Sequence, residues 1–156
     1  MDINNPFETF TKSAFRLEGL PQYRVAEEID ALIYFNKYGK IPDNFGNDWA
    51  NLVLKNASDG KSMERLRLVS EPLSNYENFE LRSYLGVVAG EKIHIANRDD
   101  YDYKYDFWFF DNKWITRMNY SADGSFIDSE TSKANKSEID MFNYWYGVYK
   151  KSKMLD

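Results

Sequence analysis

The chain contains no cysteine and only one histidine in 156 residues. Without cysteine there are no disulfide bonds, thiolate metal sites or cysteine nucleophiles, and such a chain fits a reducing compartment. A single histidine, His94, excludes the zinc sites that are built from several histidines. We therefore expect a fold held together by side-chain packing, in the cytoplasm.

Several sequence signals are also missing. There is no G-x-G-x-x-G pattern and no Walker loop, so we expect no nucleotide cofactor, and no G-x-S-x-G pattern marks a serine nucleophile. Residues 1–6 lack the basic start and apolar stretch of a signal peptide. No apolar run approaches the roughly 18 residues of a membrane helix, so no membrane span is expected.

What the chain has in abundance is apolar and acidic residues. With 43% hydrophobic and 17% aromatic residues it can build one packed core, so we expect a single domain over residues 1–156. The net charge of −5 disfavours general nucleic-acid binding, which depends on Lys and Arg at phosphates. The expected partner is another protein.

The pattern of apolar residues predicts an α+β fold. The expected architecture is an antiparallel meander sheet of about five strands packed with three to four helices. An N-terminal arm over residues 1–12 is expected to lie on the core. The predicted helices cover 26–38, 47–58, 70–89 and 137–151, and the predicted strands cover 63–69, 92–97, 105–110, 113–119 and 125–128.

A hairpin around Asp111-Asn112 is the most specific structural prediction. If these two residues form the turn, Phe110 pairs with Lys113 and Asp106 lies opposite Arg117. The period of two then places Phe107 and Phe109 on one face of the strand and Trp108 and Phe110 on the other. Because both faces are apolar, the strand is expected to be central or covered on both sides.

One candidate catalytic group lies around this hairpin. Asp106, Asp111 and Lys113, with assistance from Glu91, have the residue types of a metal-dependent nuclease, in which carboxylates hold a divalent ion and a lysine stabilises developing charge. The alternative is structural: a salt-bridged strand end followed by a polar turn. The spacing matches only part of the nuclease pattern, so the structural interpretation is preferred and no metal is expected.

Arg65 and Arg67 form a second candidate, because both project from one face of the predicted strand. Two guanidinium groups side by side can clamp a carboxylate or a phosphate. Glu80, however, falls within an apolar helix stripe and needs a cationic partner if it is buried. One of the two arginines is the natural candidate, which gives the pair a structural role.

The third candidate is the densest acidic tract of the chain, which carries Asp99, Asp100, Tyr101, Asp102 and Tyr103. It lacks the glycine and the distal glutamate of an EF-hand, so a calcium loop is disfavoured. A solvated loop is the plain interpretation. The alternative is an acidic and aromatic contact surface for a basic partner, since tyrosine offers a large contact area at low entropic cost.

A series of spaced motifs runs through residues 10 to 130. They are Phe15-Arg16-Leu17-Glu18 with Tyr23 and Glu27, Arg65-Leu66-Arg67-Leu68-Val69 with Glu71-Pro72-Leu73 and Tyr76, Gly90-Glu91, Asp106-Phe107-Trp108 with Asp111, and Met118 with Gly124. This pattern resembles an uncharacterised bacterial family that is common in actinomycetes and often encoded near helix-turn-helix regulators. The resemblance implies regulation or mobile-element biology and supplies no catalytic residues.

These observations favour a small soluble accessory or regulatory domain that acts through protein–protein contacts near residues 99–105. The resemblance adds the expectation that a prophage or mobile element encodes it. The first alternative is a metal-dependent phosphodiesterase or nuclease that uses Asp106, Asp111 and Lys113. The second is an acidic inhibitor that mimics DNA, which the net charge and a phage or host-defence setting favour.

Overall fold

The computed structural model describes residues 1–87 and 89–156. No helix in this part of the chain is long and apolar enough to cross a lipid bilayer. The helices are α1 (Pro6–Thr9), α2 (Ile29–Tyr38), α3 (Asn47–Ser58), α4 (Asn75–Tyr84) and α5 (Lys136–Lys151). The strands are β1 (Ser13–Glu18), β2 (Ser62–Val69), β3 (Lys92–Asn97), β4 (Phe107–Phe110), β5 (Trp114–Tyr120), β6 (Phe126–Lys133) and β7 (Lys153–Met154).

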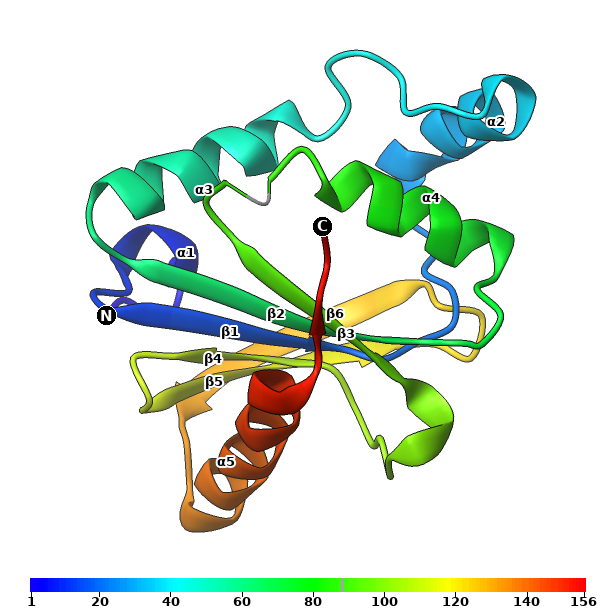
Figure 1. The fold of residues 1–156 in the computed structure, drawn as a ribbon. Helices are drawn as coiled ribbons and strands as arrows, with labels where there is room; N and C mark the ends of the chain where they lie inside the picture. Colours follow the sequence, from blue (N-terminus) through cyan, green and yellow to red (C-terminus); the bar gives the residue numbers. More distant parts are fainter. Residues whose placement is uncertain (88) are drawn as a thin grey trace.

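The strands form one mixed sheet in the order β6-β5-β4-β1-β2-β3-β7. β1, β2 and β3 run parallel to one another. β4 pairs with β1 in the antiparallel direction, β5 and β6 continue that half of the sheet, and β7 is antiparallel to β3. The N-terminal strand β1 is therefore the centre of the sheet (Figure 1).

The predicted antiparallel meander of about five strands with three to four helices is wrong. The described residues form five helices and a seven-stranded sheet that mixes parallel with antiparallel pairs. No strand was predicted over Ser13–Glu18, because the apolar residues Phe7, Phe10, Phe15 and Leu17 are irregularly spaced. β1 and β2 separate β3 from β4, which the meander placed side by side. The parallel pairs join distant segments, and hydrophobic periodicity carries no information on such pairings.

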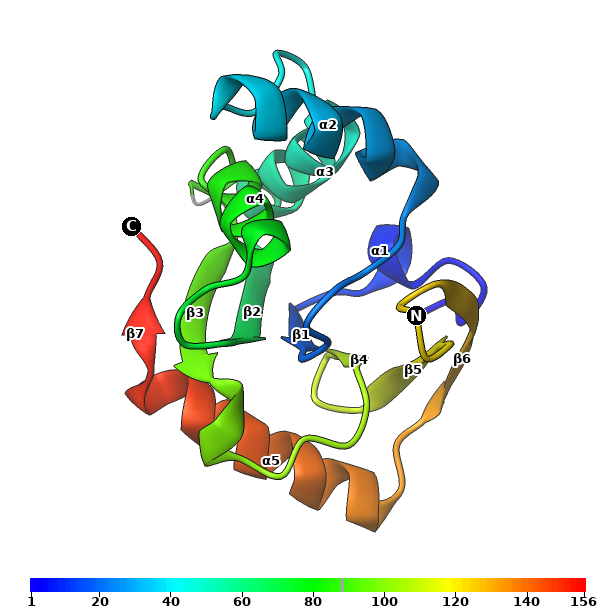
Figure 2. The same ribbon diagram turned by 90° about the vertical axis from the view of Figure 1, so that its right-hand side faces the viewer.

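Parallel strands need crossover connections, and helices supply them here. α2 and α3 connect β1 to β2, and α4 lies between β2 and β3 in the chain. Figure 2 shows α2, α3 and α4 together on one side of the sheet and α5 on the other. The two sides therefore have different chemistry, as the alternation of residues along the central strands dictates.

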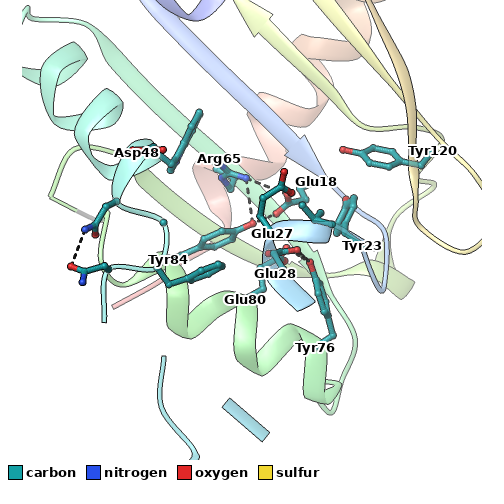
Figure 3. Close-up of a pocket in the computed structure, with 16 residues that line it drawn as sticks. Glu18, Tyr23, Glu27, Glu28, Asp48, Arg65, Tyr76, Glu80, Tyr84 and Tyr120 are labelled. Atoms are coloured by element: carbon teal, nitrogen blue, oxygen red, sulfur yellow. Dashed lines mark hydrogen bonds and ion pairs between the residues drawn. The ribbon is translucent and has the colours of Figure 1, made fainter. Parts of the chain in front are cut away.

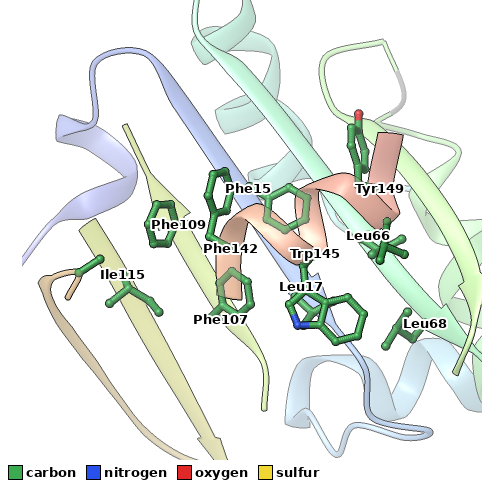
Figure 4. Packing of buried hydrophobic residues seen from close by; sticks show 12 residues of the cluster. Phe15, Leu17, Leu66, Leu68, Phe107, Phe109, Ile115, Phe142, Trp145 and Tyr149 are labelled. Atoms are coloured by element: carbon green, nitrogen blue, oxygen red, sulfur yellow. The ribbon is translucent and has the colours of Figure 1, made fainter. Parts of the chain in front are cut away.

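The side covered by α5 is an apolar core (Figure 4). α5 presents Phe142, Trp145 and Tyr149 to the sheet, and Phe109 stacks on Phe142 with ring centroids 4.2 Å apart. Burial of such side chains stabilises the fold by about 1.5 to 3 kcal/mol each. The strand residues on this side are Phe15 and Leu17 of β1, Leu66 and Leu68 of β2, and Phe107 and Phe109 of β4.

The opposite side of the same three strands carries charges. Arg16 and Glu18 of β1 alternate with the core residues of that strand, and Arg65 and Arg67 do the same in β2. The pairing places Arg16 beside Arg65 and Trp108, and Glu18 beside Arg67. The helices α3 and α4 lie over this side (Figure 2), and the charged side chains of β1 and β2 are therefore buried.

The hairpin prediction is correct in its faces and wrong in its register. Asp111 and Asn112 adopt left-handed φ angles of 55° and 56°, but Lys113 adds a residue to the loop, so Phe110 pairs with Trp114 and Phe107 with Arg117. The one-residue shift removes Asp106 from Arg117, which contacts Glu138 instead. β4 lies between β1 and β5 and is buried on both faces, as predicted.

Candidate functional site

A network of buried ionic side chains occupies the side of β1, β2 and β4 that faces α3 and α4. Arg67, Glu91 and Asp106 are at most 1% exposed, and Arg16, Glu18 and Arg65 are at most 6% exposed. Charged residues are rarely buried to this degree unless they are paired. The arrangement of their partners decides which of them are structural and which face an open space.

Glu18 is the centre of this network. Its carboxylate lies 3.2 Å from Arg65 Nη1, 3.4 Å from Arg67 Nε and 3.7 Å from Arg16 Nη2, and it accepts a short hydrogen bond from the Tyr84 hydroxyl. Burial alone would raise the pKa of Glu18, but the three guanidinium groups, Arg65 first, lower it to about 2. Glu18 therefore remains ionised and holds three arginine side chains together on one side of the sheet.

Arg65 is surrounded by acceptors and aromatic rings. Its Nη2 and Nε contact the Glu91 carboxylate at 3.2 and 3.3 Å, and its Nη1 lies 3.3 Å from the Tyr84 hydroxyl. The guanidinium carbon lies 4.8 Å from the Tyr84 ring centroid, and between 5.4 and 5.7 Å from Trp108 and Trp49. Ion pairing and cation–π contacts together fix the plane of this side chain.

Asp106 is held by four donors. Arg16 Nη2 lies 2.9 Å from its carboxylate, the Gly19 amide donates at 3.0 Å, and the hydroxyls of Tyr23 and Tyr103 donate short hydrogen bonds. A carboxylate with this many donors is a structural anchor, because each of its lone-pair directions is occupied. Asp106 ties β4 to β1 and to the segment that follows β1.

Tyr76 joins two carboxylates through one hydroxyl. Its oxygen lies 2.9 Å from Glu28 Oε1 and 3.2 Å from Glu80 Oε2. A hydroxyl has one proton to donate, so two ionised carboxylates at these distances leave one contact without a hydrogen. Because Glu80 is ion-paired with Arg67, we assign the additional proton to Glu28. Burial raises the pKa of Glu28 to about 7, and burial also raises that of Glu80 to about 7.

The additional proton on Glu28 makes the stability of the fold depend on pH. Glu28 keeps a proton in the folded chain that it loses near pH 4.5 when unfolded, so the free energy of unfolding should fall as pH rises from about 4.5 to about 7. Glu28→Gln mimics the protonated acid and should raise stability at pH 8 by about 1 to 2 kcal/mol. Urea unfolding of both chains between pH 4.5 and 8 measures this, and parallel profiles would contradict the assignment.

Beside the network lies a cavity with two lobes, the larger of which is shown in Figure 3. The larger, which we call the tyrosine lobe, has a volume of about 630 Å³ and is lined by Tyr23, Tyr76 and Tyr120. The smaller, which we call the tryptophan lobe, has about 370 Å³ and is lined by Trp49 and Trp108. Both lobes share Trp49 and residues of the network in their walls, namely Glu18, Glu28, Arg65 and Tyr84.

Two buried donors in the wall of the tryptophan lobe have no hydrogen-bond partner among the residues that the structure describes. They are Arg16 Nη1 and Trp49 Nε1, which we call the open donors. Arg67 Nη2 is the third such atom in the described chain, but Arg67 lines neither lobe and lies over the Tyr23 ring at 5.3 Å. A buried donor without an acceptor costs about 1 to 3 kcal/mol.

The structure places the predicted arginines inside the network. The expectation that one of them partners Glu80 is confirmed, because Arg67 forms that ion pair. Of the two predicted arginines, Arg65 lies at the cavity, because it lines both lobes, whereas Arg67 lines neither. The two guanidinium groups do not form a free clamp, since Glu91, Glu18 and Glu80 occupy them.

The proposed nuclease residues are not brought together. Asp106 precedes β4 and Asp111 follows it, which separates the two by roughly 15 Å along the strand. Asp111 accepts hydrogen bonds from the amides of Thr11, Lys12 and Ser13, and it organises the start of β1. In the described part of the chain no three His, Asp or Glu residues are grouped so that they could hold a metal ion.

Lys113 and Glu91, the other residues of the nuclease hypothesis, contact side chains outside that group. Lys113 lies in the hairpin loop with its amine 5.7 Å from the Trp114 ring. Glu91 is fully buried and binds Arg65. The plain interpretation of this constellation, strand-end pairing plus a polar turn, matches what the structure contains, although the partner of Asp106 is Arg16 and not Arg117.

The acidic tract is divided between solvent and interior. Asp99, Asp100 and Asp102 are exposed. Tyr101 packs on Trp145 with ring centroids 5.8 Å apart, and Tyr103 donates to Asp106, so both tyrosines anchor the loop. The surface of this loop is therefore mainly acidic.

Sequence reasoning missed Arg16, Glu18, Trp49 and Tyr84 as site residues. A usable signal was present, because Arg16-x-Glu18 and Arg65-x-Arg67 repeat the same alternation of charged and apolar residues in two segments. Parallel pairing of these segments places their charges on one side of the sheet. Trp49 carries no such signal, since a single tryptophan on an amphipathic helix reads as a core residue.

Comparisons with known proteins give a family and a fold. No curated protein matches the chain. A phospholipase D family member, Nuc from Salmonella typhimurium, is similar in structure, with a TM-score of 0.55, 7% identity, and coverage of 97% of this chain and 87% of that one. TrmBL2, an archaeal chromatin protein, gives a TM-score of 0.46 at 8% identity and covers 96% of this chain and 47% of its own.

At 7% identity the likeness to Nuc concerns the fold alone. The family match covers residues 1–152, and it confirms the expectation of an uncharacterised domain. The chain belongs to the family described as Domain of unknown function (DUF6879).

Proposed function

We propose that this protein is a ligand-binding domain that takes up a small organic molecule in the two-lobed cavity. The observation that carries the proposal is the pair of open donors, Arg16 Nη1 and Trp49 Nε1, which lack acceptors among the described residues in the wall of one lobe. Volumes of about 630 and 370 Å³ are within the range of small-molecule sites.

The ionic network suits binding better than catalysis. Its carboxylates Glu18, Glu91 and Asp106 are each occupied by arginine or tyrosine donors. A general base must reach a proton on the substrate, and these three carboxylates are already engaged by donors of the chain. Such a network instead keeps the cavity walls rigid before the ligand arrives, which limits the entropic cost of binding.

A ligand-responsive domain fits the accessory or regulatory role that the sequence suggests. Within this proposal, bacterial origin and a prophage or mobile-element setting remain expectations from the resemblance. The DNA-mimic hypothesis rests on the net charge and the expected phage or host-defence setting, and it stays a prediction, to be tested by competition with DNA for a basic partner.

A protein contact is the second candidate, and the exposed acidic loop favours it. Asp99, Asp100 and Asp102 face solvent while Tyr101 and Tyr103 hold the backbone in place. Replacing the three aspartates by Asn should abolish capture of a partner in a pull-down without loss of stability. Equal capture by this variant would remove the loop from consideration.

Thermal unfolding against a panel of amino acids, amines, organic acids, nucleosides and sugars tests the ligand-binding proposal. A ligand at a hundred times its Kd adds about 2.7 kcal/mol, which corresponds to a Tm increase of roughly 5 to 10 °C in a chain of this size. At least one class of compound should produce such a shift.

Two variants of α3 provide the control. Ala50 lines the tryptophan lobe, so Ala50→Phe should fill part of it and abolish the Tm shift. Ala57 is exposed on the same helix and lines neither lobe, so Ala57→Phe should retain the shift. A panel without any stabilising compound, or equal shifts in both variants, would overturn the proposal.

A further inference from the structure

We propose that the ligand carries a positively charged amino group, which is held in the tyrosine lobe, and an acceptor oxygen, which is held by the open donors of the tryptophan lobe. A molecule with the functional groups of an amino acid meets both requirements. This inference rests on the proposed function and assigns the chemical class of its ligand. It is argued below from the charges, the rings and the hydrogen-bonding capacity of the two lobes.

The charges of the tyrosine lobe favour a cation. Arg65 is the single basic residue in its described wall, and it is already paired with Glu91 and Glu18. The acidic residues of the wall are Glu18, Glu27, Glu28, Asp48 and Glu80. An anion that enters this lobe meets several carboxylates at short range, whereas an ammonium group is attracted to them.

Three of these acids have no ion-pair partner among the described residues, namely Glu27, Glu28 and Asp48. Figure 3 shows Glu27 and Glu28 on the turn that closes the lobe, with Tyr23 and Tyr76 beside them. Aromatic faces next to carboxylates are the usual surroundings of a bound ammonium group, because the ring quadrupole adds to the charge attraction.

The contact between Glu28 and Tyr76 supplies an adjustable acceptor. Glu28 lies 2.9 Å from the Tyr76 hydroxyl, which also lies 3.2 Å from Glu80. The charged groups that face Glu28 are Glu27 on its own turn, Glu80 on α4, Glu18 on β1 and Arg67 on β2. When an ammonium group arrives, Glu28 releases its proton and accepts from the ligand, while Tyr76 donates to one of the two carboxylates.

The tryptophan lobe has the opposite hydrogen-bonding character. Arg16 Nη1 and Trp49 Nε1 are donors, and both atoms are buried. Neither can reach bulk water without a local rearrangement. A carboxylate or carbonyl oxygen satisfies them. Phe7 and Trp108 complete this wall with apolar surface, which suits the uncharged body of a ligand.

One molecule can reach both lobes because their walls share Glu18, Glu28, Arg65 and Tyr84. Three probes that differ only in their charged groups separate the contributions. L-phenylalanine carries both an ammonium and a carboxylate, phenethylamine carries only the ammonium, and 3-phenylpropionate carries only the carboxylate. Calorimetric titration of the whole protein should give the tightest binding for L-phenylalanine, weaker binding for phenethylamine and no binding for 3-phenylpropionate.

Two nearly isosteric variants assign the groups to the lobes. Glu28→Gln should weaken L-phenylalanine and phenethylamine about tenfold, since one charge-assisted hydrogen bond is lost. Trp49→Phe retains the ring but removes the donor, and it should weaken L-phenylalanine while phenethylamine is unaffected. Circular dichroism spectra that match the wild type confirm that both variants fold.

The outcomes distinguish the class assignment from the proposed function. Binding of 3-phenylpropionate as tight as that of L-phenylalanine, or no effect of Glu28→Gln on amine binding, overturns the amine assignment and leaves ligand binding intact. A panel in which only compounds without an amino group stabilise the protein has the same meaning. If no compound of any class binds, the proposed function fails and this inference fails with it.

Discussion

Asp106→Asn is expected to lower the free energy of unfolding by about 3 kcal/mol, because it leaves the buried Arg16 guanidinium without a full countercharge. Asp106 is 1% exposed and binds Arg16, the Gly19 amide and two tyrosine hydroxyls. The amide oxygen of Asn still accepts hydrogen bonds, which keeps the cost at the lower end of the range for a broken buried ion pair. Urea unfolding at pH 7 measures the change.

Asp111→Asn is the matched control, since it makes the same chemical change at the other end of β4. Asp111 binds three backbone amides near the surface and tolerates Asn at its φ of 55°, so we expect a loss of about 1 kcal/mol. Equal losses at both positions would contradict the structural role of Asp106. Loss of a nucleic-acid-cleaving activity in both variants, with unchanged stability, would instead restore the nuclease hypothesis.

Arg67→Met is expected to have the largest effect on stability, about 3 to 5 kcal/mol. Arg67 is fully buried, binds Glu80 and Glu18, and donates to the Leu68 carbonyl at 2.7 Å. Methionine has similar length and no charge, so Glu80 is left buried without its cation. Thermal and urea unfolding should both report the loss.

A second substitution tests whether the loss comes from the unpaired acid. In the double variant Arg67→Met with Glu80→Gln, the uncompensated charge is removed, and the double variant should recover about 2 kcal/mol relative to the sum of the single changes. Arg24→Met, at an exposed ion pair with Asp123, should leave stability nearly unchanged. Strict additivity of the Arg67 and Glu80 changes would show that the pair is not coupled.

Much of the local structure was predictable from the sequence. Periodicity identified α3, α5 and β2 within one or two residues, and Gly39 ends α2 in the left-handed conformation that was predicted for it. The faces of β4 followed from alternation, because both sets of side chains are large and apolar. These features depend on residues close together in the chain, where pattern and structure correspond directly.

The sheet topology and the cavity were not predictable in this way. β1 was missed because the apolar residues of the N-terminal segment are irregularly spaced. The burial of its Arg16 and Glu18 depends on β2, which begins more than forty residues later. The cavity is formed by β1, β2, α3, α4 and the turn at Glu28. The Arg67–Glu80 pair was predicted from the sequence, since a charged residue in an apolar stripe demands a partner.

Residues of the buried network also form the walls of the cavity. Glu18 holds Arg16, Arg65 and Arg67 on the side of the sheet away from α5, and this side is where the helices leave a space. A purely apolar face would pack more simply and at no desolvation cost. We interpret the ionic groups as the means by which the fold keeps polar walls in a fixed geometry around a ligand.

The most direct test of ligand binding is the indole N–H resonance of Trp49 in a ¹⁵N correlation spectrum, assigned by its absence in Trp49→Phe. The chain has four tryptophans, and Trp145 belongs to α5 and packs on the other side of the sheet. Addition of L-phenylalanine should move the Trp49 resonance downfield and leave that of Trp145 in place. A Trp49 resonance that does not move at saturating ligand, or that moves together with Trp145, would contradict the account.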